Sequence, residues 1–338
     1  MSKLYDSIID VPGILVGHAQ DEDALTGCTA VLCLQGAVAG VDQRGGAPGT
    51  RETDLLRPMH LVRKIHAVML SGGSAFGLDA ASGAMRFLEE KKIGFPAGPV
   101  KVPIVASAIL FDLAIGSSKI RPDSKMGYRA CAQASAAPPA EGNAGAGAGC
   151  TVGKIFGMAG AVKSGIGSAS MDCGGGVRVG ALVAVNAFGD VIDPASGAIL
   201  AGARPVGTGP LRLGGGERFA DTLSVMRSPA GRLILGLAEG GNTVIGVVAT
   251  NAGLSKEEAG KMAQMAQDGL ARTVRPAHTM LDGDTIFALS TGSRKADISL
   301  VGSFAAEVFS RAIVKAVLAA RAAGGLPAAI DVRSGGVP

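Results

Sequence analysis

Short runs of apolar and β-branched residues recur along this chain, and each run is bounded by glycine, aspartate or asparagine. Each has the length of a β-strand, and boundary residues of these types are typical of turns. A chain with so many strand-length runs must pair them in sheets. We predict strands over residues 29–34, 66–71, 179–187, 243–250 and 285–291.

Helical patterns lie among and after these strands. Ser255 followed by Glu258 three positions later forms the sequence pattern of a capping box, which predicts the start of a helix. Apolar residues continue from it at helical spacing: Ala259, Met262, Ala263, Ala266 and Leu270. A second helix is predicted from residue 304 to about 323, because glycines 324–325 are typical of helix ends. The combined pattern indicates sheets covered by helices, which leaves the α/β and α+β classes both open.

Small side chains dominate the composition, with 52 Gly, no Trp and only two Tyr. The 338 residues are 47% hydrophobic, enough to bury one large core or two moderate ones, so a disordered chain is excluded. The formal net charge of +4 comes from 32 Lys and Arg against 28 Asp and Glu, spread without a basic block. Nucleic acid is therefore not expected as a partner.

The first residues, MSKLYDSIIDVPG, lack the apolar core of a signal peptide, and no apolar run approaches the roughly 20 residues that span a bilayer. We therefore expect a cytoplasmic protein without a membrane partner. The cysteines form no CxxC pair, and their odd number does not suggest a disulfide framework. We expect buried, free thiols at Cys28, Cys33, Cys131, Cys150 and Cys173.

Nucleotide-binding motifs are incomplete. In the Gly- and Ala-rich stretch 134–154, a phosphate loop would need glycine at Ala148 and a hydroxyl residue at Ile155. The stretch SGGSAFG, residues 71–77, imitates the nucleophile turn of some serine hydrolases, but Phe76 stands where glycine is required. We therefore predict an ordinary strand-to-helix turn there and no nucleotide cofactor.

The four histidines, His18, His60, His66 and His278, show no i, i+4 pairing and no nearby cysteine. The ligand spacing of a zinc site is therefore missing, and no metal is expected. A serine, histidine and aspartate triad stays open, because its members need only meet in space.

The stretch EGGNTVIGVVATNAG, residues 239–253, predicts a strand whose first residue is Thr243. If the bond before Thr243 were cut, the freed α-amine would lie beside its own hydroxyl, with a reference pKa of about 7.7–8.0. One residue would then supply both nucleophile and base. Glycine before Asn242 suits a backbone that must distort for such a cut. The same pattern also describes an ordinary strand start, since asparagine favours turns.

Several segments between about residues 9 and 292 together resemble the L-aminopeptidase/D-esterase family, which includes β-aminopeptidases and nylon-oligomer hydrolases. They are DVPGILVGH, GVDQRGGAPGTRETDLL, LSGGSAFGLDAASG, EGNAGAGAGCTVGK, VAVNAFGDVID, GGNTVIGVVATNA and HTMLDGDTIFALSTG. The resemblance implies an α+β fold, a four-layer αββα sandwich of the N-terminal-nucleophile-hydrolase type. It also implies self-cleavage between Asn242 and Thr243, with Thr243 as nucleophile, into chains 1–242 and 243–338 of one folding unit.

Four further residues are implied by matched segments of this family. Lys154 would lower the proton affinity of the amine or stabilise negative charge, and Asn186 would donate its amide to a tetrahedral oxyanion. Asp282 and Asp284, two apart on an extended segment, would orient the α-ammonium. Without the resemblance, each is better explained as a surface or turn residue.

The resemblance leaves the substrate open. The nylon-hydrolase branch has tyrosine where this chain has Phe111, so a hydroxyl near the substrate is lost, whereas Asp282 and Asp284 favour that branch. The implied substrates are small peptides, amino-acid amides or esters and ω-amino-acid oligomers. Homotetramers of the two-chain pair are implied as well. The alternatives are acyl transfer, as in the related ornithine acetyltransferases, and an inactive homologue that binds small amines.

Overall fold

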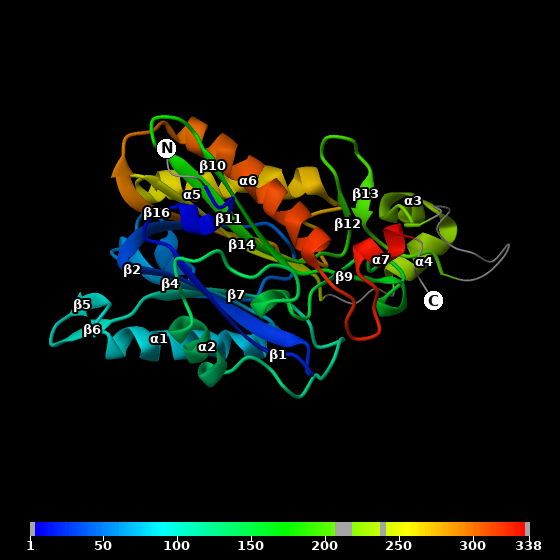
Figure 1. Ribbon diagram of the computed structural model, residues 1–338, viewed down its shortest axis with the longest axis horizontal. Helices are drawn as coiled ribbons and strands as arrows, with labels where there is room; N and C mark the ends of the chain where they lie inside the picture. Colours follow the sequence, from blue (N-terminus) through cyan, green and yellow to red (C-terminus); the bar gives the residue numbers. More distant parts are fainter. Residues whose placement is uncertain (1–3, 207–217, 237–240, 335–338) are drawn as a thin grey trace.

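The computed structural model describes residues 4–206, 218–236 and 241–334, and in it two helical layers enclose two layers of β-structure (Figure 1). Helices α5 (Lys256–Thr273) and α6 (Ile298–Ala319) cover one side. Helices α1 (Ala80–Glu90) and α2 (Ser124–Ala132) cover the opposite side. Among the described residues, no helix is both long enough and apolar enough to cross a membrane.

The β-structure forms one hydrogen-bonded network, in the order β10-β11-β14-β16-β2-β4-β7-β3, with β1 paired to β2. Strand β2 spans both layers, because its first part pairs with β1 and β4 and its last part pairs with β16. The family resemblance implied two sheets, and β2 joins them. The strands are β1 (Leu15–Asp21), β2 (Thr26–Gln43), β3 (Thr50–Arg51), β4 (Lys64–Ser71), β7 (Val105–Ile109), β10 (Ile166–Asp172), β11 (Arg178–Asn186), β14 (Thr243–Ala252) and β16 (Thr285–Arg294).

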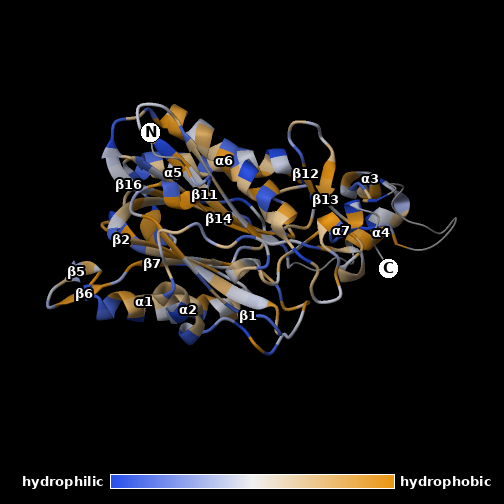
Figure 2. Ribbon diagram, in the orientation of Figure 1, coloured by the Kyte–Doolittle hydropathy of each residue, from blue (hydrophilic) through white to orange (hydrophobic). Residues whose placement is uncertain are grey.

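Side-chain alternation along the strands separates three apolar cores. On β11, Val183 and Val185 pack toward α5 and α6, whereas Leu182 lies in the core between the two β-layers. On β4, Val68 lies in that same central core and Met69 packs toward α1 and α2. Because successive strand residues point to opposite faces, this arrangement requires helices outside both layers. The predicted αββα sandwich is therefore confirmed, and Figure 2 shows its central strands as largely hydrophobic.

Four of the five predicted strands lie within observed ones, and the fifth, 179–187, ends one residue beyond β11. The two predicted helices differ in accuracy. The capping box at α5 forms as expected, since Ser255 Oγ accepts from Glu258 N at 3.2 Å and Glu258 Oε2 accepts from Ser255 N at 2.8 Å. Helix α6 begins six residues earlier than predicted, because Asp297 caps it by accepting from Ser299 N. It ends at Ala319, and glycines 324–325 belong to the turn that follows.

Smaller elements complete the chain. Four of the five cysteines are buried, Cys173 is half-buried, and all five are free, as predicted. The remaining strands are β5 (Phe95–Ala97), β6 (Val100–Val102), β8 (Thr151–Val152), β9 (Val162–Lys163), β12 (Asp190–Ile192), β13 (Ile199–Ala201) and β15 (Val274–Arg275). The remaining α-helices are α3 (Thr222–Arg227), α4 (Pro229–Gly236) and α7 (Ala329–Arg333).

Candidate active site

Thr243 is the first residue of β14, as the sequence predicts, and its side chain is buried. The strand lies between β11 and β16, and Thr243 stands opposite Asn186 in the antiparallel register with β11. Gly241 lies two residues before Thr243. Its backbone has φ +148°, and a Cβ on it would meet the ring of Phe111 at 3.0 Å. Glycine is therefore required at 241, whereas Gly240 lies outside the described residues.

The peptide bond before Thr243 has two hydrogen-bond donors on its carbonyl oxygen. Thr243 Oγ1 donates to the Asn242 oxygen, and Gly283 N donates to the same atom at 2.9 Å. Gly283 also comes close to the hydroxyl, because a Cβ on it would lie 3.0 Å from Thr243 Oγ1. Both donors polarise the carbonyl, and the hydroxyl of the next residue lies against it. Sequence reasoning missed the Gly283 amide, because every residue except proline carries such a donor.

Asp284 links the loop after β15 to the strand that begins with Thr243. Its Oδ1 accepts from Val244 N at 2.8 Å. Its Oδ2 accepts from His278 twice, from the backbone N at 3.1 Å and from Nδ1 at 2.8 Å. The side chain is only 1% exposed. The structure thus places Asp284 directly against the residue after Thr243.

Asp282 lies beside Asn242, with which it pairs in a parallel β-bridge. Its carboxylate accepts from Phe188 N at 3.3 Å and from both the backbone N and the hydroxyl of Thr279. Burial raises the pKa of Asp282, and the negative charge of Asp284 raises it further. Asp282 therefore binds a proton more readily than an ordinary aspartate.

Lys154 reaches the site through Asn186. Its Nζ donates to the Asn186 backbone oxygen at 2.9 Å and to Oδ1 at 2.8 Å. Burial of the ammonium lowers the pKa of Lys154 from 10.5 to about 7, although the charge of Asp282 opposes the shift. A lysine of this kind changes its charge near neutral pH, which surface lysines do not.

Asn186 turns its two amide ends in different directions. Its Oδ1 accepts from Lys154 and from Thr151 N at 3.0 Å. Its Nδ2 donates to the Phe111 oxygen at 2.8 Å and to the Gly241 oxygen at 3.3 Å. In the uncut chain this donor thus meets the carbonyl one residue before that of Asn242. Its predicted oxyanion contact therefore stays a prediction.

A cavity of about 470 Å³ opens beside these residues. Its size falls within the usual range for small-molecule sites. Its walls are mainly apolar, with Lys154, Asp112 and Asn242 among the polar exceptions, and Phe111 lies on the wall. The full lining is Phe111, Asp112, Ala114, Ile115, Gly149, Thr151, Lys154, Ile155, Gly157, Met158, Phe188, Ile234, Gly241 and Asn242.

Two other sequence predictions also have a place in the structure. Ser74 starts a 3-10 turn, Ser74–Asp79, between β4 and α1, so the expected strand-to-helix turn is confirmed. His278, by contrast, received no role from the sequence, yet it contacts Asp284. Its position in the segment HTMLDGD, next to the two aspartates, was the only available signal.

Comparison with known proteins agrees with the family resemblance of the sequence motifs. A model of Peptidase family S58 matches residues 6–329. An uncharacterised aminopeptidase of Mycobacterium tuberculosis is 44% identical, with 98% of each chain covered. A 6-aminohexanoate-oligomer endohydrolase of Kocuria sp. is 31% identical, with 91% of this chain and 84% of that protein covered.

Solved structures share the fold. A Burkholderia sp. β-aminopeptidase matches with a TM-score of 0.68 and 22% identity, covering 100% of this chain and 96% of that one. The L-aminopeptidase D-Ala-esterase/amidase of Ochrobactrum anthropi matches with a TM-score of 0.70 and 20% identity, covering 98% of this chain and 93% of that one. The latter is described as a variant of the Ntn hydrolase fold, in agreement with the fold predicted here.

Proposed function

This chain belongs to peptidase family S58 and is an amide-hydrolysing enzyme of the aminopeptidase type, and we propose that it activates itself by cutting the bond between Asn242 and Thr243. The observation that carries the proposal is the pair of donors on the Asn242 carbonyl, one of them the Thr243 hydroxyl. The released Thr243 is then both the nucleophile and, through its α-amine, the base.

Self-cleavage proceeds by an acyl shift. Thr243 Oγ1 attacks the carbonyl carbon of Asn242, and the Gly283 N–H holds the negative charge that develops on the oxygen. The bond from that carbon to the Thr243 nitrogen breaks, and the hydroxyl proton passes to the nitrogen. The resulting ester is hydrolysed by water, which leaves a carboxylate on Asn242 and restores the hydroxyl of Thr243.

Turnover repeats the chemistry on a substrate amide. The Thr243 α-amine accepts the hydroxyl proton, and Oγ1 attacks the carbonyl carbon of the substrate. The bond from that carbon to the substrate nitrogen breaks, the leaving amine takes the proton, and Oγ1 is left carrying the acyl group. Water then hydrolyses the acyl-enzyme. We assign Lys154 and Asn186 to the stabilisation of developing negative charge, because Lys154 donates to Asn186 and Asn186 stands opposite Thr243. We assign Asp282 and Asp284 to orientation of the amine.

The two chains should stay together after cleavage. In the sheet, β14 and β16 of the second chain lie between β11 and β2 of the first. Separation would expose both long strand pairings and two apolar cores. We therefore propose one folding unit made of chains 1–242 and 243–338.

The cavity favours an acyl group that is aliphatic or small, because its walls are mainly apolar and its polar groups are few. We propose small peptides, amino-acid amides and esters, and ω-amino-acid oligomers as the substrate classes. The printed activity of the Kocuria sp. relative, on 6-aminohexanoate oligomers, supports the last of these.

A product assay tests this function. Purified protein is incubated in water with an aminoacyl amide, a dipeptide or a linear 6-aminohexanoate oligomer, with and without a free amino acid as acceptor. We expect the free acid and the free amine, in equal amounts, under both conditions. Predominant acylation of the acceptor would instead assign the chain to acyl transfer, and absence of any product would contradict the proposed substrates.

A further inference from the structure

His278 makes the contacts that hold the far side of Asp284. Both its backbone N and its Nδ1 donate to Asp284 Oδ2. Its backbone has φ +57°, a left-handed conformation that is uncommon for residues other than glycine. The side chain is 19% exposed, so the imidazole is largely enclosed with the carboxylate. Uncommon backbone conformations that place a side chain against a buried carboxylate cluster at functional sites.

Asp284 passes this contact on to the nucleophile strand. Its other oxygen accepts from Val244 N, and that amide is bonded directly to Thr243. His278, Asp284 and the Thr243–Val244 peptide therefore form one connected series. A shift of the carboxylate would change the hydrogen bond that fixes this peptide, and with it the direction of the Thr243 backbone.

We propose that His278 is a positioning residue, which holds the Asp284 carboxylate against the Thr243–Val244 peptide and so aligns Thr243 for self-cleavage and for turnover. The inference rests on the proposed function of Thr243. His278 itself does not touch the reacting atoms, and its effect passes through Asp284.

The loop that carries Asp282 and Asp284 has other hydrogen bonds besides the imidazole contact. Backbone hydrogen bonds from a neighbouring segment hold it independently: Arg44 N to the Asp284 oxygen, Gly46 N to the Thr279 oxygen and Ala47 N to the Asp282 oxygen, at 2.8–3.0 Å. Thr279 adds side-chain and backbone contacts to Asp282. We therefore assign the imidazole contact to the position of the Asp284 carboxylate, and not to the closure of the loop.

The contact also separates the two aspartates by environment. All partners of Asp284 are N–H donors, from His278 and Val244, so both of its oxygens act as acceptors. The neighbouring Asp282 is the one whose pKa is raised, by burial and by the charge of Asp284. By holding Asp284 in place, His278 also fixes the position of the charge that raises the pKa of Asp282.

Two substitutions at one position isolate the ring. His278→Gly removes the imidazole but suits the left-handed backbone, so it adds no strain. His278→Asn also tolerates that conformation and places an amide N–H where Nδ1 stood. His60→Asn, at an exposed histidine, is the matched control. The rate of self-cleavage, kcat and KM are measured for each variant.

We expect His278→Gly to slow self-cleavage and lower kcat by about 10–100-fold, the range found when outer partners of site residues are lost, with KM within threefold of wild type. His278→Asn should restore both rates to within about threefold of wild type, and His60→Asn should match wild type. A His278→Gly variant that cuts and turns over normally would overturn the inference, as would an asparagine variant no better than glycine. An active but uncut wild type would instead contradict the proposed function.

Discussion

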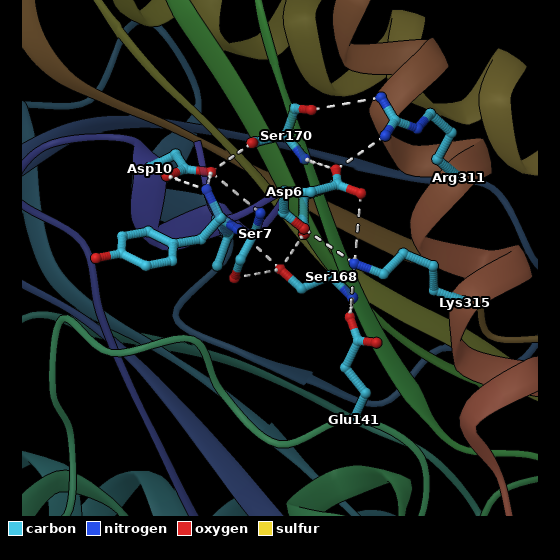
Figure 3. Close-up of polar contacts among 11 residues, drawn as sticks. Asp6, Ser7, Asp10, Glu141, Ser168, Ser170, Arg311 and Lys315 are labelled. Atoms are coloured by element: carbon cyan, nitrogen blue, oxygen red, sulfur yellow. Dashed lines mark hydrogen bonds and ion pairs between the residues drawn. The ribbon is translucent and has the colours of Figure 1, made fainter. Parts of the chain in front are cut away.

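Two polar clusters in this molecule differ in how their charges are paired. The first, the N-terminal clasp, ties the start of the chain to β10 and α6 and consists of Asp6, Ser7, Asp10, Glu141, Ser168, Ser170, Arg311 and Lys315 (Figure 3). In it Arg311 meets Asp6 at 2.9 Å and Lys315 meets Glu141 at 3.0 Å. In the second, around Thr243, neither Lys154 nor Asp282 has an oppositely charged partner at ion-pair distance among the described residues.

This difference in charge pairing indicates different roles for the two clusters. Paired charges at the clasp satisfy one another, and because its ion pairs are partly exposed they contribute little energy individually. Unpaired groups in the active site keep the cost of burial, which appears as a pKa of about 7 at Lys154 and a raised pKa at Asp282. Such perturbed groups are typical of reactive sites. Changes at Thr243 and Lys154 should therefore alter chemistry, and changes at the clasp should alter stability.

Thr243→Ala should have the largest effect. It removes the attacking oxygen, so the chain should stay uncut and folded, with turnover lowered by at least about 10⁴-fold. Thr250→Ala is the matched control, because Thr250 is another buried threonine of β14, and its hydroxyl donates to the Arg178 oxygen and accepts from Ala252 N, away from the site. Cleavage is followed by mass, turnover by product release. Normal turnover from Thr243→Ala would end this assignment.

Lys154→Met should come next. We expect kcat to fall by about 10²–10³-fold, the loss seen when one charge-stabilising donor is removed, and self-cleavage to slow as well. Lys261→Met, at an exposed lysine of α5, should match wild type. If the Lys154 variant is cut and stays within threefold of wild-type activity, the lysine has no part in catalysis.

The charge of Lys154 should also appear in stability against pH. Between pH 7 and 10.5 the unfolded chain keeps the lysine proton that the folded chain has released, so the free energy of unfolding should rise with pH across this window. We compare uncut Thr243→Ala with the double variant Thr243→Ala, Lys154→Met. The free energy of unfolding of the first minus that of the second should rise from pH 7 to 9 by on the order of 1–2 kcal/mol. Denaturant unfolding at both pH values measures it. A constant difference would show that Lys154 is not a perturbed group.

Ser168→Ala tests the clasp and should have the smallest effect on activity. Ser168 Oγ accepts from Ile8 N at 2.8 Å and donates to the Ala181 oxygen at 2.9 Å, in a fully buried position. Its loss should lower the free energy of unfolding by about 1–3 kcal/mol and leave kcat within threefold of wild type. Lost activity at unchanged stability would mean that the clasp communicates with the active site.

Sequence predicted the strands well because alternation and boundary residues are local, and Thr243 could be placed at the start of its strand for the same reason. The order of the layers could not be predicted from local patterns. Periodicity left the α/β and α+β classes open, and the family resemblance supplied the αββα sandwich. Helix α6 was placed too late because its start was set at Phe304, and Asp297, which caps the helix, was not considered.

The site was predictable only in its side chains. Lys154, Asn186, Asp282 and Asp284 were named from matched segments, and the structure brings them around Thr243. The Gly283 amide was missed, because a backbone donor acquires its role only when the loop meets Asn242 in space. His278 was missed because its ring meets Asp284 only through the left-handed backbone conformation at residue 278. A histidine in the sequence does not predict that conformation.

The central claim is that this enzyme works through a threonine that it releases from its own chain. Intact-mass analysis of purified, active wild-type protein, followed by N-terminal sequencing of the smaller fragment, tests it most directly. We predict two chains, residues 1–242 and 243–338, the second beginning with Thr243. A fully active preparation that consists of one uncut chain would contradict the mechanism.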